Sequence, residues 1–155
     1  MTFQHDVVEP TAAGYWRLDD ARRYVAGSSL GGLISMRLAL TYPDRYAGAA
    51  SISGAFWPGQ DTSTALRDEL TAKVGVAIYL DHGGDAQSGG DGFDDSVEIR
   101  DQMMGLGWDR ADSPDCASGS PGPNDLCYHH EPGATHDELA WKARTWRWLR
   151  FFVGR

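Results

Sequence analysis

The sequence has no apolar run long enough to cross a bilayer, which takes about 20 residues. Its first ten residues also lack the basic-then-apolar order of a signal peptide. Basic residues are scarce: the sequence has 14 Lys and Arg against 22 Asp and Glu, which gives a formal net charge of -8. Anionic surfaces repel such a chain, so we expect neither nucleic acid nor a membrane as a partner.

Cysteine is scarce as well, with two in the chain, Cys116 and Cys127. They flank a segment rich in Gly, Pro and Ser, where a disulfide would tie down a loop of little regular structure. A disulfide would favour a secreted or periplasmic location, whereas two free thiols would fit the cytoplasm. The sequence leaves both possibilities open.

The rest of the composition is typical of one globular unit. The chain has 155 residues, of which 41% are hydrophobic, and it includes 19 Gly and 6 Trp. This length supports one sizeable core and is too short for two ordinary domains. We therefore expect a single domain over residues 1–155, with a poorly defined lead-in over residues 1–20.

Short apolar runs alternate with segments whose apolar residues recur at helical spacing. This alternation predicts an α/β fold, a mostly parallel sheet with helices on its faces in three layers. Loops are predicted at residues 83–92 and 112–125, which are rich in Gly and polar residues. Strands are predicted over residues 23–26, 48–53, 74–80 and 126–130, and helices over 30–40, 95–106 and 137–153. The last helix is expected to face the sheet through Leu139, Trp146, Leu149 and Val153.

A Gly-x-Ser-x-Gly motif at residues 27–31 lies between the first predicted strand and helix. Its glycines are expected where the backbone is too close to itself to admit a Cβ, and Ser29 is expected in a strained conformation that exposes its hydroxyl. Ser29 is the predicted nucleophile, and Ser28, which is not at the centre of the motif, is the weaker candidate. The N–H of Leu30 is predicted to stabilise an oxyanion. Taken alone, so short a motif would also fit an ordinary strand-to-helix turn.

A serine nucleophile needs a base, and in this kind of fold the acid precedes the histidine in the chain. Of five histidines, His136 lies in a predicted loop that opens the last helix, and it is the predicted base. The acid that orients its ring is expected in the loop after the third strand, where Asp85 fits best. Asp91, Asp94 and Asp95, further along the same acidic loop, remain alternatives for this acid, whereas Asp81 is expected within or at the end of the strand.

Two further residues, Ser28 and Trp57, are candidates for the substrate pocket. Trp57 follows the second predicted strand and would wall an acyl or aromatic pocket, or simply pack. Residues 85–98 hold enough carboxylates for a hard cation such as calcium, but their spacing matches no EF-hand loop. We therefore expect no metal and no cofactor, and a small-molecule ester as the partner.

Three segments of the sequence resemble the putative-esterase family of α/β-hydrolases, which includes enterochelin esterases, feruloyl esterases, S-formylglutathione hydrolases and mycolyltransferases. The resemblance implies a serine ester hydrolase and carries the catalytic role onto His136. In the resulting hypothesis Ser29 attacks, His136 relays the proton, and Asp85, chosen by its position, orients His136. Transfer of the acyl group to an acceptor other than water would use the same residues. The segments are residues 23–33 with 42–44, residues 51–57, and residues 133–138 with Trp141 and Arg144.

Members of this family carry a long segment before the motif, which supplies the first strands and a second oxyanion N–H. We therefore expect the chain to represent the C-terminal half of such a domain, with about four strands. The strand at residues 23–26 would then be an exposed edge, open to association with a partner or with a separate N-terminal half. A non-catalytic binding module is the alternative function.

Overall fold

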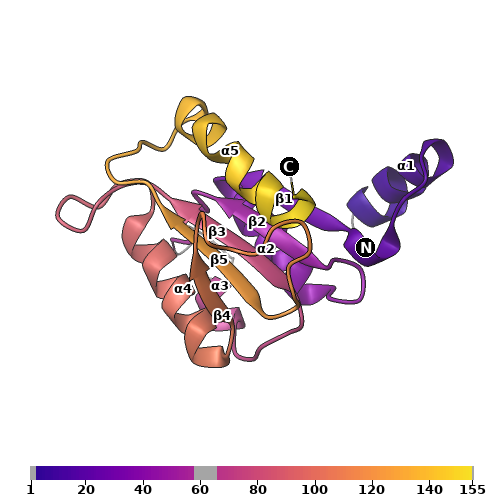
Figure 1. Cartoon of the computed structure of the whole chain (residues 1–155), viewed down its shortest axis with the longest axis horizontal. Coiled ribbons are helices and arrows are strands. Elements are labelled where there is room, and N and C mark those ends of the chain that lie inside the picture. The colour runs from indigo at the N-terminus through magenta and orange to yellow at the C-terminus, as the bar shows by residue number, and fades with distance from the viewer. Residues whose placement is uncertain (1–2, 58–65, 155) are drawn as a thin grey trace.

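The computed structural model describes residues 3–57 and 66–154 and contains one five-stranded parallel sheet (Figure 1). The strand order is β1-β2-β3-β5-β4, and every neighbouring pair is parallel. The strands are β1 (Tyr24–Ser28), β2 (Gly48–Ile52), β3 (Ala77–His82), β4 (Asp109–Asp112) and β5 (Asp125–His130). The helices are α1 (Glu9–Tyr15), α2 (Leu30–Thr41), α3 (Leu66–Glu69), α4 (Phe93–Leu106) and α5 (Glu138–Val153), with a π-helical turn at Gln4–Val8 and a 3₁₀ turn at Asp20–Arg22.

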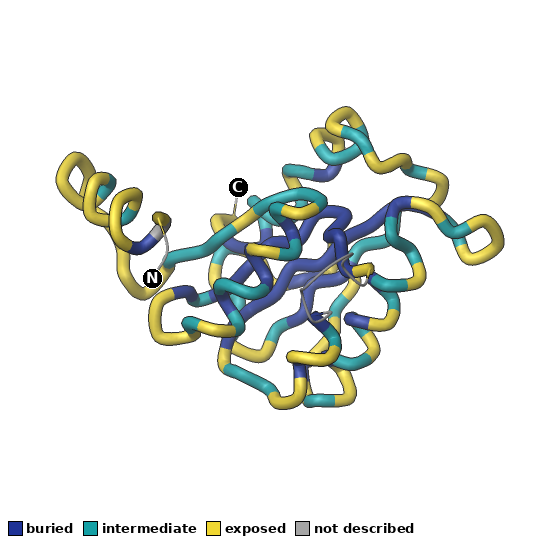
Figure 2. The backbone as a smooth tube through the Cα atoms, turned by 180° about the vertical axis from the view of Figure 1, so that it is seen from behind, coloured by how far each residue is buried: buried dark blue, intermediate teal, exposed yellow. Residues whose placement is uncertain are grey.

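Helices cover both faces of the sheet, which makes three layers. Ile78 and Leu80 of β3 belong to the apolar cluster shared with α2, α3 and α4, whereas Ala77 and Tyr79 belong to the cluster shared with α5. Every residue of β2 and β3 is buried (Figure 2). Buried, mostly apolar central strands are typical of parallel sheets with both faces covered, so the predicted α/β class is confirmed.

Apart from shifts of one or two residues at strand ends, such as β1 continuing to Ser28, the strand predictions differ from the structure at β4 and β3. β4 has the sequence Asp-Arg-Ala-Asp and was not expected, because a short polar strand at a sheet edge has no apolar alternation. β3 begins at Ala77 and runs on through Asp81 and His82, both of them fully buried polar residues. The sheet therefore has five strands where about four were predicted.

The prediction of which α5 residues face the sheet is wrong at three of the four positions. Leu139 is 79% exposed, and Trp146 and Val153 also lie in solvent. The stripe that packs on the sheet is displaced around the helix and includes a charged residue in its middle, which is why apolar spacing alone missed it. The residues of this stripe are Trp141, Arg144, Trp148, Phe151 and Phe152.

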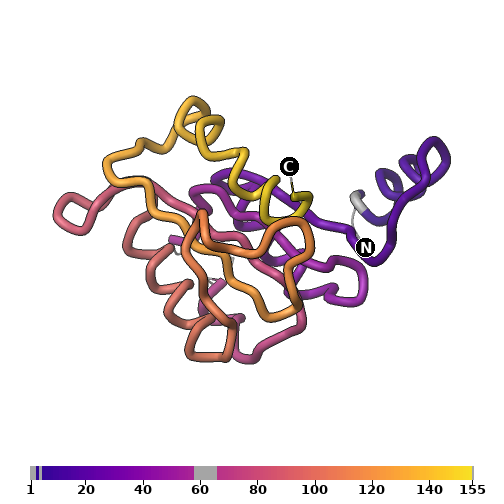
Figure 3. Tube along the Cα trace, viewed as in Figure 1, coloured from indigo at the N-terminus to yellow at the C-terminus, as the bar shows by residue number. Residues whose placement is uncertain are grey.

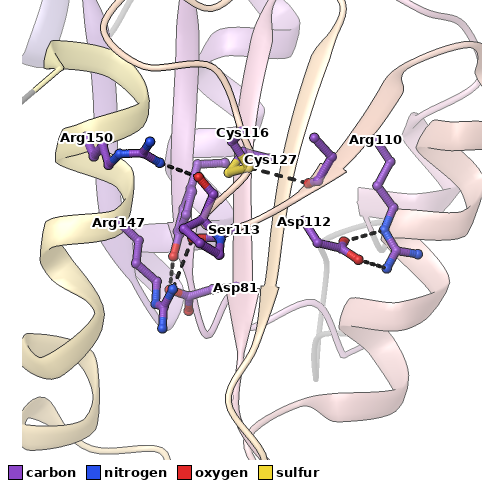
Figure 4. Close-up of a disulfide and its surroundings, with 11 residues drawn as sticks. Asp81, Arg110, Asp112, Ser113, Cys116, Cys127, Arg147 and Arg150 are labelled. Atoms are coloured by element: carbon purple, nitrogen blue, oxygen red, sulfur yellow. Dashed lines mark hydrogen bonds and ion pairs between the residues drawn. A yellow bond between two sulfur atoms is a disulfide. The ribbon is translucent and has the colours of Figure 1, made fainter.

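Cys116 and Cys127 form a disulfide, which ties the segment after β4 to β5 (Figure 4). Both sulfur-bearing residues are buried in the cluster beneath α5. The same segment is fastened to α5, because Arg147 Nη1 donates to Ser113 Oγ at 3.1 Å. The loop predicted at residues 112–125 is therefore held in two ways, by the disulfide to β5 and by a side-chain hydrogen bond from α5.

β1 is an outer strand of the sheet formed by the described residues, as expected from the sequence. Beyond it, the N-terminal helix α1 extends away from the sheet (Figure 1) and is held by Glu9, which accepts hydrogen bonds from Arg23 and Tyr46. Across residues 3–57 and 66–154, no helix combines the length and apolar character that a membrane span requires.

Candidate active site

The segments that follow β1, β2, β3 and β5 meet at one edge of the sheet, because all strands are parallel and their carboxyl ends coincide. The loop after β3 and the segment after β5 lie at the same end of the molecule (Figure 3). They are joined there by backbone hydrogen bonds, from Gly84 N–H to Ala134 O at 2.9 Å and from Gly133 N–H to Gly84 O at 3.0 Å. Side chains from distant parts of the sequence are thereby held together.

Ser29 occupies the turn between β1 and α2 in a strained conformation, with φ 54° and ψ -124°. Such a backbone costs about 1–3 kcal/mol and persists only where the surroundings enforce it. Here its N–H donates to Ile52 O and its carbonyl accepts from Ala55 N–H, both at 3.0 Å. Leu30 begins α2, and helix geometry leaves the N–H groups of a first turn without partners inside the helix.

The two glycines of the motif have different roles. An added Cβ at Gly27 would lie 2.5 Å from the carbonyl carbon and oxygen of Gly31, which are backbone atoms. A Cβ at Gly31 would meet nothing within 4 Å. The expectation that both motif glycines exclude a Cβ therefore holds for Gly27 and is wrong for Gly31.

Gly27→Ala is expected to lower the free energy of unfolding by about 3 kcal/mol or more, because the backbone must shift to admit the methyl group. Gly31→Ala should be neutral or slightly stabilising, since alanine is favoured over glycine inside a helix. Urea unfolding of both variants measures the difference. Equal losses of stability would contradict this account of the turn.

His136 lies between β5 and α5 and connects the Ser29 hydroxyl to a carboxylate. Its Nε2 is 2.8 Å from Ser29 Oγ, and its Nδ1 is 2.7 Å from Asp91 Oδ1. Because a carboxylate can only accept, Nδ1 carries the proton and Nε2 accepts from the serine. The rings of Trp57 and Trp141 approach the imidazole edge to face, with centroids 6.0 and 5.0 Å away.

The carboxylate against His136 is that of Asp91, and the prediction of Asp85 is corrected. The Asp85 carboxylate accepts instead from the backbone N–H groups of Gln87 and Ser88 and from the Ser88 hydroxyl. These hydrogen bonds, those of Ser88 first, hold the pKa of Asp85 below its usual value. The loop doubles back through a bridge between Asp85 and Gly89, which leaves Asp85 partly exposed and returns the chain so that Asp91 is buried.

Behind Asp91 is a buried polar group formed by Asp81, Ser53 and Arg144. Arg144 Nη2 donates to Ser53 Oγ at 2.6 Å, and its Nε donates to Asp81 Oδ1 at 3.2 Å. Burial raises the pKa of Asp81 to about 6, although Arg144 and the Tyr79 hydroxyl act in the opposite direction. In the sequence, the signal of this group is the helical spacing of Arg144, three residues after Trp141 and four before Trp148.

The two predicted pocket residues do not line a common cavity. Ser28 lines a cavity of about 190 Å³ between β1 and α5, together with Trp141, Thr145 and Trp148. Trp57 is not part of that cavity and is partly exposed beside His136. Among the described residues, no three His, Cys, Asp or Glu side chains are grouped as metal ligands would be.

The site contains a hydroxyl that is hydrogen-bonded to an imidazole, and the imidazole is hydrogen-bonded in turn to a buried carboxylate. These are the groups needed for nucleophilic attack on a carbonyl. The imidazole can take the hydroxyl proton as the new bond forms. The carboxylate fixes the ring orientation and offsets the charge that the ring acquires.

Comparison with known proteins gives the same fold and a family. A family model described as putative esterase matches residues 1–146. An uncharacterised protein of Bacillus subtilis (strain 168), YbbA, is 39% identical over 69 residues, which are 43% of this chain and 28% of that protein.

Among solved structures, the enterobactin esterase FES from Shigella flexneri superposes with a TM-score of 0.65 at 21% identity, over 90% of this chain and 34% of its own. A ferulic acid esterase superposes with a TM-score of 0.73 at 17% identity, over 99% of this chain and 60% of its own. An S-formylglutathione hydrolase from Agrobacterium tumefaciens superposes with a TM-score of 0.58 at 14% identity, over 96% of this chain and 56% of its own. The chain spans less than two thirds of each of these relatives. Because the family model matches nearly the whole of this chain, residues 1–146, the chain belongs to the putative-esterase family.

Proposed function

We propose that the protein is a serine ester hydrolase in which Ser29 is the nucleophile, His136 the general base and Asp91 the carboxylate that orients His136. The observation that carries the proposal is the unbroken hydrogen-bonded chain from Ser29 Oγ through both ring nitrogens of His136 to Asp91. Family membership supports it.

The reaction proceeds in two halves. Ser29 Oγ attacks the ester carbonyl carbon while its proton passes to His136 Nε2, and the carbonyl oxygen becomes an oxyanion. The imidazolium then gives that proton to the leaving alkoxide as the carbon–oxygen bond breaks, which leaves an acyl group on Ser29. Water repeats the sequence, with its proton taken by Nε2, and releases the carboxylic acid and the serine.

The oxyanion needs hydrogen-bond donors, and the N–H of Leu30 at the start of α2 supplies one of them. The positive end of the helix dipole reinforces that donor. One such donor contributes about 10²- to 10³-fold to the rate of acyl transfer.

The substrate class is a carboxylic ester with one small or flat substituent. The ring of Trp57, whose centroid lies 6.0 Å from that of His136, offers an aromatic surface for it, and the cavity of about 190 Å³ that Ser28 lines begins one residue before the nucleophile. An alcohol that replaced water in the second half would make the protein an acyltransferase with the same residues.

The acyl-enzyme is tested by rapid mixing with p-nitrophenyl acetate. We expect a burst of about one p-nitrophenolate per chain and a mass increase of one acetyl group on Ser29, because so activated an ester acylates the serine faster than water removes the acetyl group. A folded chain that neither hydrolyses the ester nor becomes acetylated on Ser29 would refute the proposed hydrolase function.

That negative result would favour a second candidate function, a module that acts with a partner. The observation in its favour is the position of β1 at the edge of the sheet, where one row of backbone N–H and C=O groups has no neighbouring strand among the described residues. A partner strand that paired there would adjoin the turn that carries Ser29.

A further inference from the structure

Arg144 is a guanidinium placed in the interior, 1% exposed, on the face of α5 that packs on the sheet. A buried charge is costly unless it is paired and hydrogen-bonded. Arg144 meets Asp81 through Nε, Ser53 Oγ through Nη2 and, at 3.6 Å, Asp91 Oδ2 through the same Nη2. Arg144 is therefore connected to Asp91, the carboxylate that contacts His136, both through Ser53 and by its own ion pair.

The direction of the Ser53 hydroxyl follows from these contacts. A guanidinium can only donate, so Ser53 Oγ accepts from Arg144 Nη2. A hydroxyl has one proton, and the carboxylate of Asp91, which can only accept, lies 2.6 Å away. The Ser53 proton is thus directed at Asp91 Oδ2.

The Ser53 backbone is fixed as firmly as its side chain. Ser53 has φ 47°, a left-handed conformation that side chains rarely adopt. Its N–H donates to the carbonyl oxygen of Asp81 at 2.9 Å and to the carboxylate of the same residue at 3.2 Å. This conformation lets the hydroxyl reach both Arg144 and Asp91 from the end of β2.

The two oxygens of the Asp91 carboxylate have separate partners. Oδ2 accepts from Ser53 Oγ and from the Gly83 N–H, whereas Oδ1 contacts His136 Nδ1 at 2.7 Å. Rotation of the carboxylate away from the imidazole would break both hydrogen bonds to Oδ2. We propose that Ser53, itself oriented by Arg144, is a positioning residue that aims Asp91 at His136. This inference rests on the proposed hydrolase function.

The test compares Ser53→Ala and Ser53→Gly with Ser51→Ala. Ser51 is a matched control, because it is also fully buried, lies two residues earlier, and its hydroxyl has no hydrogen-bond partner in the described part of the chain. Glycine removes the same hydroxyl as alanine and tolerates the left-handed backbone, so it gives a folded variant if alanine does not. Two kinds of measurement are made: the kinetics of p-nitrophenyl ester hydrolysis, as kcat and KM, and the downfield proton resonance of His136 Nδ1–H.

Both Ser53 variants are expected to lose about tenfold to a hundredfold in kcat with little change in KM, the size of effect typical of a hydrogen bond to a charged group. The Nδ1–H resonance should broaden or disappear, and Ser51→Ala should keep both properties of the parent. Arg144→Lys retains the charge but cannot reach Asp81 and Ser53 at once, so its kcat should also fall.

Loss of stability with an unchanged kcat and an unchanged resonance would show a purely structural role and overturn the inference. A lower kcat with an unchanged resonance would overturn it too, because Ser53 would then act at another step. If Arg144→Lys kept the parent kcat, the part assigned to Arg144 would be wrong. A parent chain that hydrolyses no ester would reject the proposed function, and the resonance would still decide whether Ser53 positions Asp91.

Discussion

Ser29→Ala is expected to lower kcat/KM for a p-nitrophenyl ester by roughly four to six orders of magnitude. The methyl group cannot form the acyl-enzyme, and His136 then has no hydroxyl to activate. Catalysis left in the variant would come from the Leu30 N–H and from substrate binding alone. The measurement is the steady-state rate of each variant over a range of substrate concentrations, corrected for hydrolysis in buffer.

Ser28→Ala is the control for this prediction, since Ser28 is the neighbouring hydroxyl and lines the cavity beneath α5. It should change kcat/KM by less than about tenfold, as expected for one contact in a small pocket. If Ser28→Ala were as inactive as Ser29→Ala, the assignment of the nucleophile would be wrong. The far-UV circular dichroism of both variants should match that of the parent, because neither substitution adds an atom.

Asp91→Asn is expected to lower kcat by about 10⁴-fold. The amide keeps the shape of the side chain but can turn its NH₂ group toward His136 Nδ1, which would favour the ring tautomer with the proton on Nε2. In that tautomer the imidazole cannot accept the Ser29 proton, although the distances of 2.7 and 2.8 Å could be preserved. The substitution therefore tests whether catalysis requires the correct tautomer of His136 and not only the correct distances in the site.

Asp85→Asn tests the competing assignment in the same loop. Asp85 is partly exposed, and its carboxylate accepts hydrogen bonds from residues 87 and 88 and none from His136, so this variant should retain kcat within about twofold. A loss at Asp85 comparable to that at Asp91 would contradict the position of the loop. Comparison of kcat for the two variants at saturating substrate is sufficient.

The sequence predicted those parts of the site that depend on local patterns. An apolar run, a Gly-x-Ser-x-Gly turn and a helical repeat follow one another between residues 23 and 40, so Ser29 could be placed on its turn before its neighbours were known. His136 could be chosen because it alone of the histidines was expected in a loop before a helix. The α/β class followed from the alternation of strands and helices in the same way.

The path of a loop could not be predicted from local patterns. Asp85 and Asp91 lie in one Gly-rich segment, and their roles are decided by the point at which the chain turns back, between Asp85 and Gly89. No periodicity marks such a turn. Arg144 was missed as part of the interior for a related reason, since a charged residue is read as exposed unless its buried partners, here Asp81 and Ser53, are known.

In the proposed reaction Ser29 is an activated nucleophile because His136, oriented by Asp91, takes its proton. This activation is tested most directly by reaction of the chain with a fluorophosphonate, followed by mass spectrometry of its peptides. One phosphonate per chain is expected, located on Ser29 and absent from Ser29→Ala. A folded chain that stays unlabelled, or that carries the label on another residue, would contradict it.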